Sequence, residues 1–581
     1  MENKELLEMV RSKAQSWLTK SYDAETRAQV QALLDNEDPT ELIESFYKDL
    51  EFGTGGLRGI MGVGSNRMNI YTVGAATQGL SNYLKKEFAD LDQIKVVIGH
   101  DCRNNSRKFA EISADIFSAN GIKVYLFEDL RPTPEMSYTI RKLGCQSGII
   151  LTASHNPKEY NGYKAYWDDG AQMIAPHDKN TIAEVNKIRN ASEIKFKGNK
   201  ELIEIIGKEI DDAYMAELKK LVLHQECIDK YGKELKIVYT PLHGTGNIPA
   251  RRILRELGFE NVYVVPEQEL PDGDFPTVSY PNPEAAEAFE LALALAKQHD
   301  ADLVLATDPD ADRLGVYVKD KDGEYHCLTG NMSGSLLAEY ELSQIKATKG
   351  LPKDGALIKS IVTTNLVNEM AKSYGVKLVE VLTGFKFIGQ KMLEFETKHN
   401  GTYLFGFEES YGCLIGTHAR DKDAIVATMA LCEAAAYYRS QGKTLWDAMI
   451  DIYEKYGYHV DAIHTLTLKG IEGLEKIKSI MDQLKSHTPK EIAGLEVLWA
   501  RNYDNDTATN MKNKAVVPTG LPKSNVVYYE LEGGAWLCVR PSGTEPKIKF
   551  YYGVIGKDFD DAQKKSEEFG EAVNKMIEYM M

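Results

Sequence analysis

The chain has 581 residues, more than one hydrophobic core usually serves, so about three to five domains are expected. With 43% hydrophobic and 27% charged residues, its composition is that of a globular protein and excludes a disordered or collagen-like chain. The formal net charge of −17 argues against nonspecific nucleic-acid binding, because affinity for phosphate backbones comes from clustered lysine and arginine.

Membrane attachment is not expected. Residues 1–17 alternate charged and apolar side chains instead of forming the apolar core of a signal peptide, and no run of about 18 apolar residues occurs. The seven cysteines are an odd number without a C-x-x-C pair, as is typical of reduced thiols. We therefore expect a cytoplasmic monomer or homodimer that binds neither membranes nor nucleic acid.

Predicted elements begin with two amphipathic helices over residues 1–45, the second starting at Pro39-Thr40. Helical stretches at 108–121 and 200–222 then alternate with apolar strand segments. These segments are 95–99, 123–127, 147–151, 235–247, 261–267, 302–316, 356–364, 377–385 and 402–412. In the last quarter, segments 459–470, 526–532 and 535–554 instead alternate polar and apolar residues.

This order of elements predicts the fold class. Apolar strands that alternate with helices indicate largely parallel α/β sheets, whereas polar–apolar alternation indicates antiparallel strands with one solvated face. We predict an α/β protein with three mixed-sheet α/β domains and a C-terminal α+β domain. The expected boundaries are a helical lead-in at 1–45 and domains at 46–205, 206–325, 326–455 and 456–581.

A serine follows the predicted strand 147–151, in the motif T-A-S-H-N-P. Ser154 is not in the G-x-S-x-G elbow of a hydrolase, since Thr152 and Asn156 stand where glycines belong. His155 is a poor base for Ser154, because side chains of adjacent residues usually diverge. Taken alone, the motif is equally compatible with a turn that ends a strand.

Three aspartates follow a strand further along the chain, in T-D-P-D-A-D-R. In an extended segment, the spacing of Asp308, Asp310 and Asp312 points all three carboxylates the same way. Converging carboxylates repel each other unless a cation lies between them, and oxygen ligands favour Mg²⁺ or Ca²⁺. We predict Mg²⁺ with at least one position open to a phosphate oxygen. The alternative is an aspartyl nucleophile of the haloacid-dehalogenase type, although that pattern prefers Thr or Val at position 312.

Other metal and nucleotide motifs lose support. An EF-hand would need glycine at Arg313 and glutamate at Lys319. The glycine-rich stretch 52–59 places Arg58 where a dinucleotide fingerprint needs its last glycine, and Gly442-Lys443-Thr444 lacks the leading glycine of a Walker A motif.

Two further loops offer groups for a polar ligand. Glu408 and Ser410 carry the acceptors that polyol hydroxyls need, and a small basic cluster of His418, Arg420 and Lys422 follows them. Near the C-terminus, Arg540, Ser542, Gly543 and Thr544 form a loop that can wrap an anion with a guanidinium fork, hydroxyls and backbone amides.

The four loops together resemble those of the α-D-phosphohexomutase superfamily. The loops 152-TASHNP-157, 308-DPDADR-313, 408-EES-410 and 540-RPSGTEP-546 occur in this order, one in each predicted domain. The resemblance covers roughly residues 45–555, and the chain length is similar to that of the phosphoglucomutase and phosphopentomutase branch.

The resemblance implies a role for each candidate residue. Ser154 would carry a phosphoryl group, and one Mg²⁺ would be held by the three aspartates and a phosphoserine oxygen. The transferring group would be surrounded by Arg58, His155, Lys164 and Arg313, with His155 or Lys422 as general acid/base. The sugar would be held by Glu408, Ser410, Thr383, Gly384 and Lys386, beside the basic cluster of His418 and Arg420. Its distal phosphate would be bound by Arg540, Ser542, Gly543 and Thr544.

The implied activity is an intramolecular phosphotransfer, with four domains around one cleft so that either end of a phosphosugar can react. The expected reaction interconverts glucose 1-phosphate and glucose 6-phosphate through a hexose 1,6-bisphosphate, which also acts as activator. Phe407 before the sugar-loop glutamate and Tyr411-Gly412 after the serine favour glucose over mannose phosphates, while pentose phosphates remain open. A phosphosugar-binding protein without turnover is a second class of function, although no expected catalytic position is missing.

Overall fold

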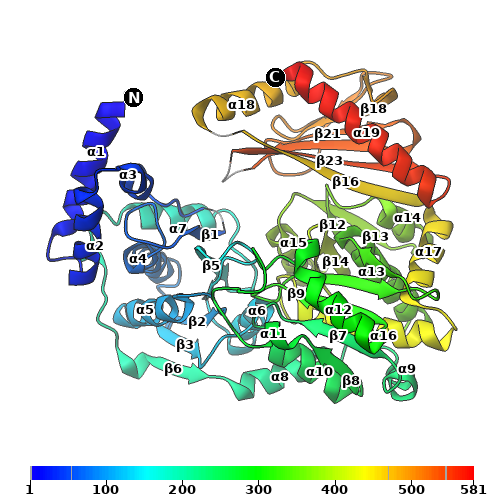
Figure 1. Cartoon of the computed structure of the whole chain (residues 1–581), viewed down its shortest axis with the longest axis horizontal. Coiled ribbons are helices and arrows are strands. Elements are labelled where there is room, and N and C mark those ends of the chain that lie inside the picture. Colours follow the sequence, from blue (N-terminus) through cyan, green and yellow to red (C-terminus); the bar gives the residue numbers. More distant parts are fainter. Residues whose placement is uncertain (1–2, 54, 469, 543–545) are drawn as a thin grey trace. The chain divides into compact units, whose positions relative to one another are not determined.

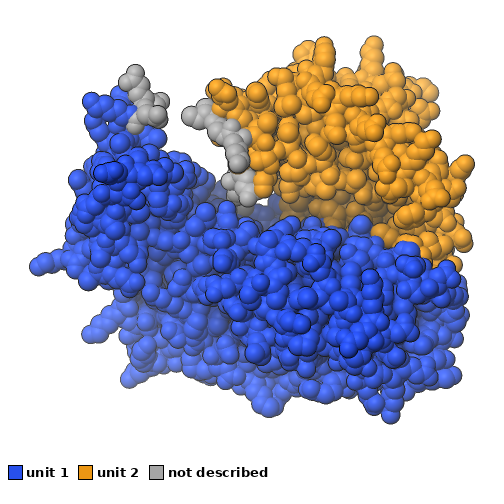
Figure 2. All heavy atoms as spheres, viewed as in Figure 1, with its two compact units in different colours: residues 1–329, 385–406, 410–444 blue, residues 330–384, 407–409, 445–581 orange. Residues whose placement is uncertain are grey.

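The computed structural model describes residues 3–53, 55–468, 470–542 and 546–581 (Figure 1). The chain divides into two compact units (Figure 2). Unit 1 contains residues 1–329, 385–406 and 410–444, and unit 2 contains residues 330–384, 407–409 and 445–581. Among the described residues, none of the helices combines the length and the apolar character needed to cross a membrane.

The first sheet carries the Ser154 loop, and its strands lie in the order β1-β5-β4-β2-β3-β6. They are β1 Gly56–Ile60, β2 Lys95–His100, β3 Lys123–Phe127, β4 Ser147–Leu151, β5 Tyr160–Trp167 and β6 Ile203–Ile206. Strand β2 pairs in parallel with β3 and β4, whereas β5 runs antiparallel to both β4 and β1. The sheet is therefore mixed, as predicted.

Helices cover both faces of this sheet. They are α4 Ile70–Glu87, α5 Ser106–Ala119, α6 Thr133–Leu143 and α7 His177–Asn186. Helices α4 and α5 share a core with the strand residues Val96, Ile149 and Tyr163. On the other face α6 comes so close to β4 that a Cβ on Gly148 would lie 2.6 Å from Cδ1 of Ile140. This close packing favours glycine at position 148 and holds α6 beside the strand that leads to Ser154.

The second sheet carries the three aspartates, and its strands lie in the order β11-β10-β9-β7-β8. They are β7 Lys236–Thr240, β8 Asn261–Val264, β9 Leu303–Thr307, β10 Leu314–Lys319 and β11 Tyr325–Leu328. The helices of this region are α8 Lys208–Lys219, α9 Gln225–Tyr231, α10 Asn247–Leu257, α11 Pro266–Glu269 and α12 Glu290–His299. Because β9 is parallel to β7 and antiparallel to β10, the aspartates occupy a tight connection between paired strands.

A third sheet has the strand order β13-β12-β14-β15. Its strands are β12 Gly355–Ser360, β13 Lys377–Val381, β14 Thr402–Glu408 and β15 Gly412–Leu414. The helices of this stretch are α13 Gly330–Thr348, α14 Leu366–Tyr374, α15 Phe385–Lys398, α16 Ala424–Ser440 and α17 Leu445–Tyr456. Strands β12 and β13 pair in parallel, as expected for an α/β region.

The C-terminal sheet is antiparallel, in the order β16-β23-β22-β21-β18-β19-β20, with β17 paired to β18. Its strands are β16 Tyr458–Thr467, β17 Glu491–Ile492, β18 Leu495–Asn502, β19 Thr507–Asn510, β20 Val516–Val517, β21 Val527–Leu531, β22 Trp536–Pro541 and β23 Lys547–Gly556. Apolar side chains of α18 Gly470–Ser486 and α19 Phe559–Met580 complete its core. The predicted class, α/β regions followed by an α+β region, is confirmed.

Two details of the prediction are wrong. Within the described residues 3–53, the N-terminal region has three α-helices and not two, namely α1 Asn3–Gln15, α2 Ala24–Asp35 and α3 Thr40–Phe46. The first predicted helix is interrupted before α2, because the Asp23 side chain accepts a hydrogen bond from the backbone N–H of Thr26 and caps the start of α2. Strand β6 interrupts the helical segment predicted at 200–222, because its short run pairs with β3.

Candidate active site

Ser154 lies in a loop whose backbone carbonyls are hydrogen-bonded by a buried arginine. Its φ of 53° is in the left-handed region, which a non-glycine residue adopts only when its surroundings hold it there. The Arg103 guanidinium donates hydrogen bonds to the carbonyl oxygens of Ser154 and Asn156 at 2.6 Å, Pro157 at 2.9 Å and Tyr160 at 3.1 Å. This fork fixes four carbonyls of one loop and thereby the direction of the Ser154 side chain.

The carboxylate of Asp101 orients the Arg103 guanidinium, whose four bonds to the Ser154 loop we call the Arg103 clamp. Oδ2 of Asp101 lies 3.3 Å from Nε of Arg103 and accepts a hydrogen bond of 2.6 Å from the Thr152 hydroxyl. Thr152 Oγ1 in turn accepts a hydrogen bond from the backbone N–H of Ser154. Both Asp101 and Arg103 are buried, so their charges depend on this pairing.

The three aspartates converge as predicted, but through a turn and not an extended segment. One carboxylate oxygen from each of Asp308, Asp310 and Asp312 lies within 4.8 Å of the others. Ala311 has a φ of 52°, and its backbone N–H donates to the carbonyl of Asp308. This left-handed residue folds the loop back, so the carboxylates meet without the alternation of a strand.

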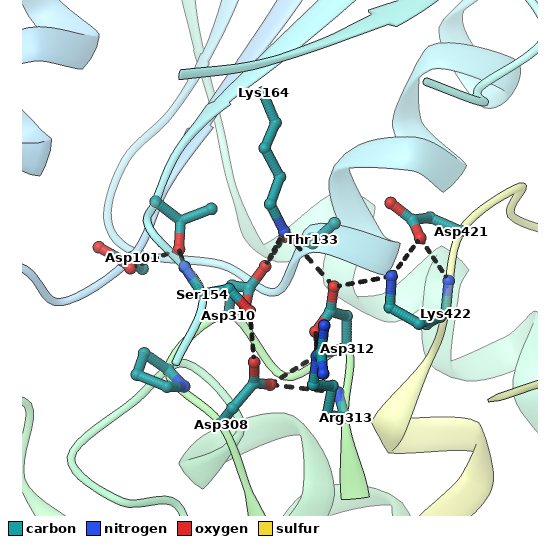
Figure 3. A network of polar contacts seen from close by, with 12 residues as sticks. Asp101, Thr133, Ser154, Lys164, Asp308, Asp310, Asp312, Arg313, Asp421 and Lys422 are labelled. Atoms are coloured by element: carbon teal, nitrogen blue, oxygen red, sulfur yellow. Dashed lines mark hydrogen bonds and ion pairs between the residues drawn. The ribbon is translucent and has the colours of Figure 1, made fainter. Parts of the chain in front are cut away.

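The aspartates face Ser154, whose hydroxyl donates a hydrogen bond of 2.9 Å to Oδ2 of Asp308 (Figure 3). Oδ1 of Asp308 accepts the backbone N–H groups of Asp312 and Arg313 at 3.2 and 3.1 Å. Burial, followed by the neighbouring carboxylates of Asp310 and Asp312, raises the pKa of Asp308 well above its usual value. The cluster is thus an accumulation of negative charge that a cation would relieve.

Two lysines and a threonine surround the other carboxylates. Lys164 Nζ and the Thr133 hydroxyl both donate to Oδ2 of Asp310, each at 2.7 Å. Oδ2 of Asp312 lies 3.4 Å from Nζ of Lys164 and 3.4 Å from Nζ of Lys422. Although burial opposes it, these ammonium groups lower the pKa of Asp312 far below its usual range.

The donor set fits a hard divalent cation. Among the described residues, Oδ1 of Asp310 and Oδ1 of Asp312 are buried without a hydrogen-bond partner, and Oδ1 of Asp312 lies 3.9 Å from Nε of Arg313. A buried carboxylate oxygen without a partner is costly unless an ion binds it. Carboxylate oxygens are the ligands that Mg²⁺ prefers, so these two oxygens and Asp308 are suitable metal ligands.

Three of the other predicted residues also lie beside the Ser154 loop or the aspartates. Nδ1 of His155 lies 3.4 Å from the Ser154 hydroxyl. Arg58 donates to Oδ1 of Asn156 at 3.3 Å, and Arg313 donates to the carbonyl of Ser410 at 3.0 Å. Burial and then the positive charges of Arg313 and Arg58 hold the pKa of His155 well below its usual value. These contacts place Arg58 and His155 at the Ser154 loop, while the roles of all three residues in phosphoryl transfer stay a prediction.

The basic cluster divides into one residue at the aspartates and two in the protein's framework. His418 Nε2 lies 2.8 Å from Oδ2 of Asp423, and Arg420 forms an ion pair with Glu396 at 2.9 Å. The side chains of His418 and Arg420, which were predicted to contact the substrate, are both 3% exposed. They hold the segment that presents Lys422, while their predicted contacts with substrate stay a prediction.

In unit 2, the backbone N–H of Gly384, which follows Thr383, donates to Oε1 of Glu408 at 2.9 Å. Oε2 of Glu409 accepts bonds of 3.2 Å from the hydroxyls of Ser360 and Thr363. The sugar-loop carboxylates are therefore fixed by neighbouring backbone and side chains.

The predicted phosphate loop begins after β22, with Arg540 in the strand and the backbone N–H of Ser542 bonded to the carbonyl of Lys547. Gly543 and Thr544 lie outside the described residues. Lys386, at the start of α15 in unit 1, lines a cavity of about 310 Å³ with Trp167, Gln172 and His177.

Sequence reasoning missed Thr133, Arg103, Tyr166 and Asp421. Two of them had a usable signal. Tyr166 is two residues after Lys164, a spacing that places both on one face of an extended segment, although no strand was predicted there, and Asp421 directly precedes Lys422. Arg103 and Thr133 reach partners far away in the chain, and nothing in their local sequence marks those contacts.

Comparison with known proteins identifies related domains. Family models described as phosphoglucomutase/phosphomannomutase alpha/beta/alpha domains I, II and III match residues 49–192, 212–323 and 329–456. A phosphoglucomutase of Staphylococcus epidermidis (strain ATCC 35984) is 37% identical over 540 residues, covering 92% of this chain and 96% of the relative. A phosphoglucomutase of Staphylococcus aureus (strain N315) is 36% identical over 552 residues, covering 94% and 97%.

Solved structures show the same fold. A putative phosphomannomutase from Thermus thermophilus superposes with a TM-score of 0.69 at 22% identity, covering 91% of this chain and 99% of that one. The open form of parafusin, a phosphoglucomutase from Paramecium, gives a TM-score of 0.68 at 19% identity, covering 92% and 96%.

Proposed function

Because this chain belongs to the phosphoglucomutase/phosphomannomutase family of the α-D-phosphohexomutase superfamily, we propose that it interconverts glucose 1-phosphate and glucose 6-phosphate. The observation that carries the proposal is the hydroxyl of Ser154 at 2.9 Å from Asp308, within a buried carboxylate cluster. The choice of glucose is supported by relatives named phosphoglucomutase over almost their whole length.

Ser154 acts as a phosphoryl carrier in this proposal. A phosphoryl group on its Oγ is transferred to a free hydroxyl of the bound sugar phosphate, so one P–O bond breaks at Ser154 and one forms at the sugar. Ser154 Oγ takes up a proton as it leaves and the sugar hydroxyl gives one up, with Lys422 and His155 as the candidate acid/base groups; an ammonium group of Lys422 would donate to Oγ before it accepts from the sugar. In the return step the bisphosphate gives its other phosphoryl group to Ser154, whose hydroxyl loses its proton, and the sugar oxygen that is released gains one.

Charge around Ser154 supplies the catalysis. Hydrolysis of a phosphate monoester is among the slowest reactions, and enzymes lower such barriers by up to about 20 kcal/mol or more, mainly through positioning and charge stabilisation. Arg58, Lys164 and Arg313 provide the positive charge at this loop. One Mg²⁺, held by Asp308, Asp310 and Asp312, would neutralise charge on the phosphoryl oxygens when bound.

The remaining predicted residues bind the substrate. Glu408 and Ser410 accept hydrogen bonds from sugar hydroxyls, and Thr383, Gly384 and Lys386 contribute further contacts from a separate segment. Arg540, Ser542, Gly543 and Thr544 bind the phosphate that does not react, because a guanidinium fork and hydroxyls match its oxygens. Binding one phosphate while the other reacts lets the same loops accept either end of the sugar.

Locating the enzyme-bound phosphate tests the mechanism. After incubation with glucose 1,6-bisphosphate and Mg²⁺, peptide mass spectrometry is expected to find phosphate on Ser154, and a Ser154→Ala variant is expected to show neither phosphate nor turnover. Phosphate on Asp308, lost in Asp308→Asn but kept in Ser154→Ala, would instead show the aspartyl mechanism.

A substrate panel tests the choice of sugar. With glucose, mannose, glucosamine and ribose 1-phosphates, we expect the highest kcat/KM for glucose 1-phosphate, stimulation by the 1,6-bisphosphate and loss of activity on chelation of Mg²⁺. Binding of these sugars without turnover of any would contradict the enzymatic proposal.

A further inference from the structure

Two side chains on one face of strand β5, those of Lys164 and Tyr166, contact aspartates in or beside the carboxylate cluster. Lys164 and Tyr166 are two residues apart, so both lie on the face opposite Tyr163 and Ala165, which belong to the core with α4 and α5. Lys164 reaches Asp310, as described above. Tyr166 reaches Asp421, whose Oδ2 accepts a hydrogen bond of 2.5 Å from the tyrosine hydroxyl.

Asp421 divides its two oxygens between Tyr166 and Lys422. Oδ1 accepts the backbone N–H of Lys422 at 2.8 Å and lies 3.3 Å from its Nζ. The same Nζ lies 3.4 Å from Oδ2 of Asp312, so the ammonium group sits between two carboxylates (Figure 3). A chain of contacts thus leads from Tyr166 through Asp421 to Lys422 and the aspartate cluster.

The contacts in this chain are shielded from water. Tyr166, Asp421 and Lys422 are 0%, 2% and 7% exposed. A buried carboxylate depends on its donors, because water cannot replace a missing hydrogen bond there. Burial, and then the negative charge of Asp421, raises the pKa of Tyr166 well above its usual value, so the hydroxyl stays a donor.

Lys422 needs such support because its stem is flexible. Four methylene groups allow Nζ to reach any of several acceptors, and only the surroundings select one position. Asp421 is adjacent in sequence and could rotate with the lysine if its own side chain were not tied to β5. The hydroxyl of Tyr166 is that tie.

We propose that Tyr166 and Asp421 are positioning residues that hold the ammonium group of Lys422 beside Asp312 for phosphoryl transfer. The inference rests on the proposed function, since it concerns how Lys422 serves that reaction. Neither residue contacts the reacting atoms. Their contribution is the fixed location of one nitrogen, and this location matters most in the transition state, where misplacement raises the barrier.

The test is a kinetic comparison of two isosteric variants. Tyr166→Phe is expected to lower kcat about 10-fold, the effect of losing a hydrogen bond to a charged group, while KM for glucose 1-phosphate changes less than about twofold. Tyr163→Phe is the matched control, because its buried hydroxyl bonds Thr77 Oγ1 at 3.1 Å on the other face of the same strand. The control should keep the wild-type kcat with a comparable loss of thermal stability. Equal kcat values in the two variants would overturn the inference.

A double-mutant cycle tests whether Tyr166 acts through Asp421. Asp421→Asn alone is expected to lower kcat, and adding Tyr166→Phe to it should cost less than about twofold more, because the contact it removes is already impaired. Independent effects that multiply would contradict the chain of contacts.

Labelling of Lys422 separates this inference from the proposed reaction. Reductive methylation, quantified on the peptide that contains Lys422, is expected to be about threefold faster in Tyr166→Phe than in Tyr163→Phe, because the released amine exchanges more often with solvent. This measurement needs no turnover. Equal labelling would overturn the positioning role, whereas faster labelling in a protein without mutase activity would support positioning and refute the proposed function.

Discussion

The hydroxyl of Thr133 donates a hydrogen bond of 2.7 Å to Oδ2 of Asp310, and the backbone N–H of Thr133 donates to the Asp310 carbonyl at 2.9 Å. Thr133 begins helix α6 beside the first sheet, whereas Asp310 lies in the loop after β9. The two-point contact fixes the aspartate rotamer. Its buried Oδ1 has no hydrogen-bond partner within the described part of the chain, so this oxygen is available as a ligand for a cation.

Removing the Thr133 hydroxyl should therefore weaken metal binding. For Thr133→Val we expect the Mg²⁺ concentration at half-maximal activity to rise about 10-fold, as is typical when a partner of a metal ligand is lost. Isothermal titration with Mg²⁺ checks affinity directly, without turnover. Thr139→Val is the control, because this buried hydroxyl of the same helix bonds the carbonyl of Glu135 four residues earlier. Equal Mg²⁺ affinity in both variants would show that the contact does not orient Asp310.

Weakening the Arg103 clamp should impair the positioning of Ser154, not the binding of metal. Lysine keeps the charge but has no planar fork, so Arg103→Lys leaves at least some of the four carbonyls of the Ser154 loop without donors. We expect kcat to fall at least about 10-fold, because small displacements of a reacting group are costly. Phosphate incorporation on Ser154 should slow by a similar factor. Arg107→Lys is the control, since Arg107 also donates to a carbonyl, that of Phe127, but lies outside the loop. Equal phosphorylation rates in the two variants would exclude a special role for the clamp.

The side chain of Lys422 packs directly against Gly412, so a larger residue at position 412 should displace it. A Cβ at position 412 would overlap the Cδ atom of Lys422 and lie 2.7 Å from its Cγ. A flexible side chain gives way before the backbone does, so Gly412→Ala should displace the lysine and lower kcat about 10-fold or more with little loss of stability. Gly99→Ala is the control, because the nearest atoms to its Cβ would lie at an ordinary 3.6 Å. If Gly412→Ala lost stability and kept the kcat of the surviving enzyme, the lysine would not be the group displaced.

How far the sequence predicts this molecule depends on how local each signal is. Strand β4 was predicted with its observed bounds, because an uninterrupted apolar run is a local pattern. The Asp308 cluster was predicted from spacing alone, yet its turn was not, since the left-handed Ala311 leaves no trace in composition.

Contacts between residues that are far apart in the chain set the limit of what the sequence predicts. Arg103 bonds carbonyls more than 50 positions away, and Tyr166 meets an aspartate 255 positions away. Only the folded chain brings such partners together, and a single sequence contains no record of the pairing. Strand β6 was missed for a related reason, because its four residues form a strand only beside β3.

In unit 2, Asp461 carries a prediction about pH. It lies on β16, and its Oδ1 is buried with no hydrogen-bond partner among the residues that the structure describes. Burial raises its pKa from 3.8 to about 6, although Thr364, Lys359 and Trp536 oppose this effect. The folded state therefore binds the proton more tightly than the unfolded state. Its contribution to stability is present in full below pH 3.8 and is lost as the pH rises through 6.

Asp461→Asn should remove this pH dependence, because the amide does not ionise. Between pH 4 and 7, the free energy of local opening at β16 is expected to fall by at most about 3 kcal/mol more in the wild type than in the variant. Hydrogen exchange of peptides that cover β16, corrected for the intrinsic rate at each pH, measures this difference. Asp482→Asn, at an exposed position of α18, should retain the wild-type slope. Parallel slopes in the wild type and Asp461→Asn would mean that Asp461 is already ionised below pH 4 in the folded protein, and that Lys359 offsets its burial.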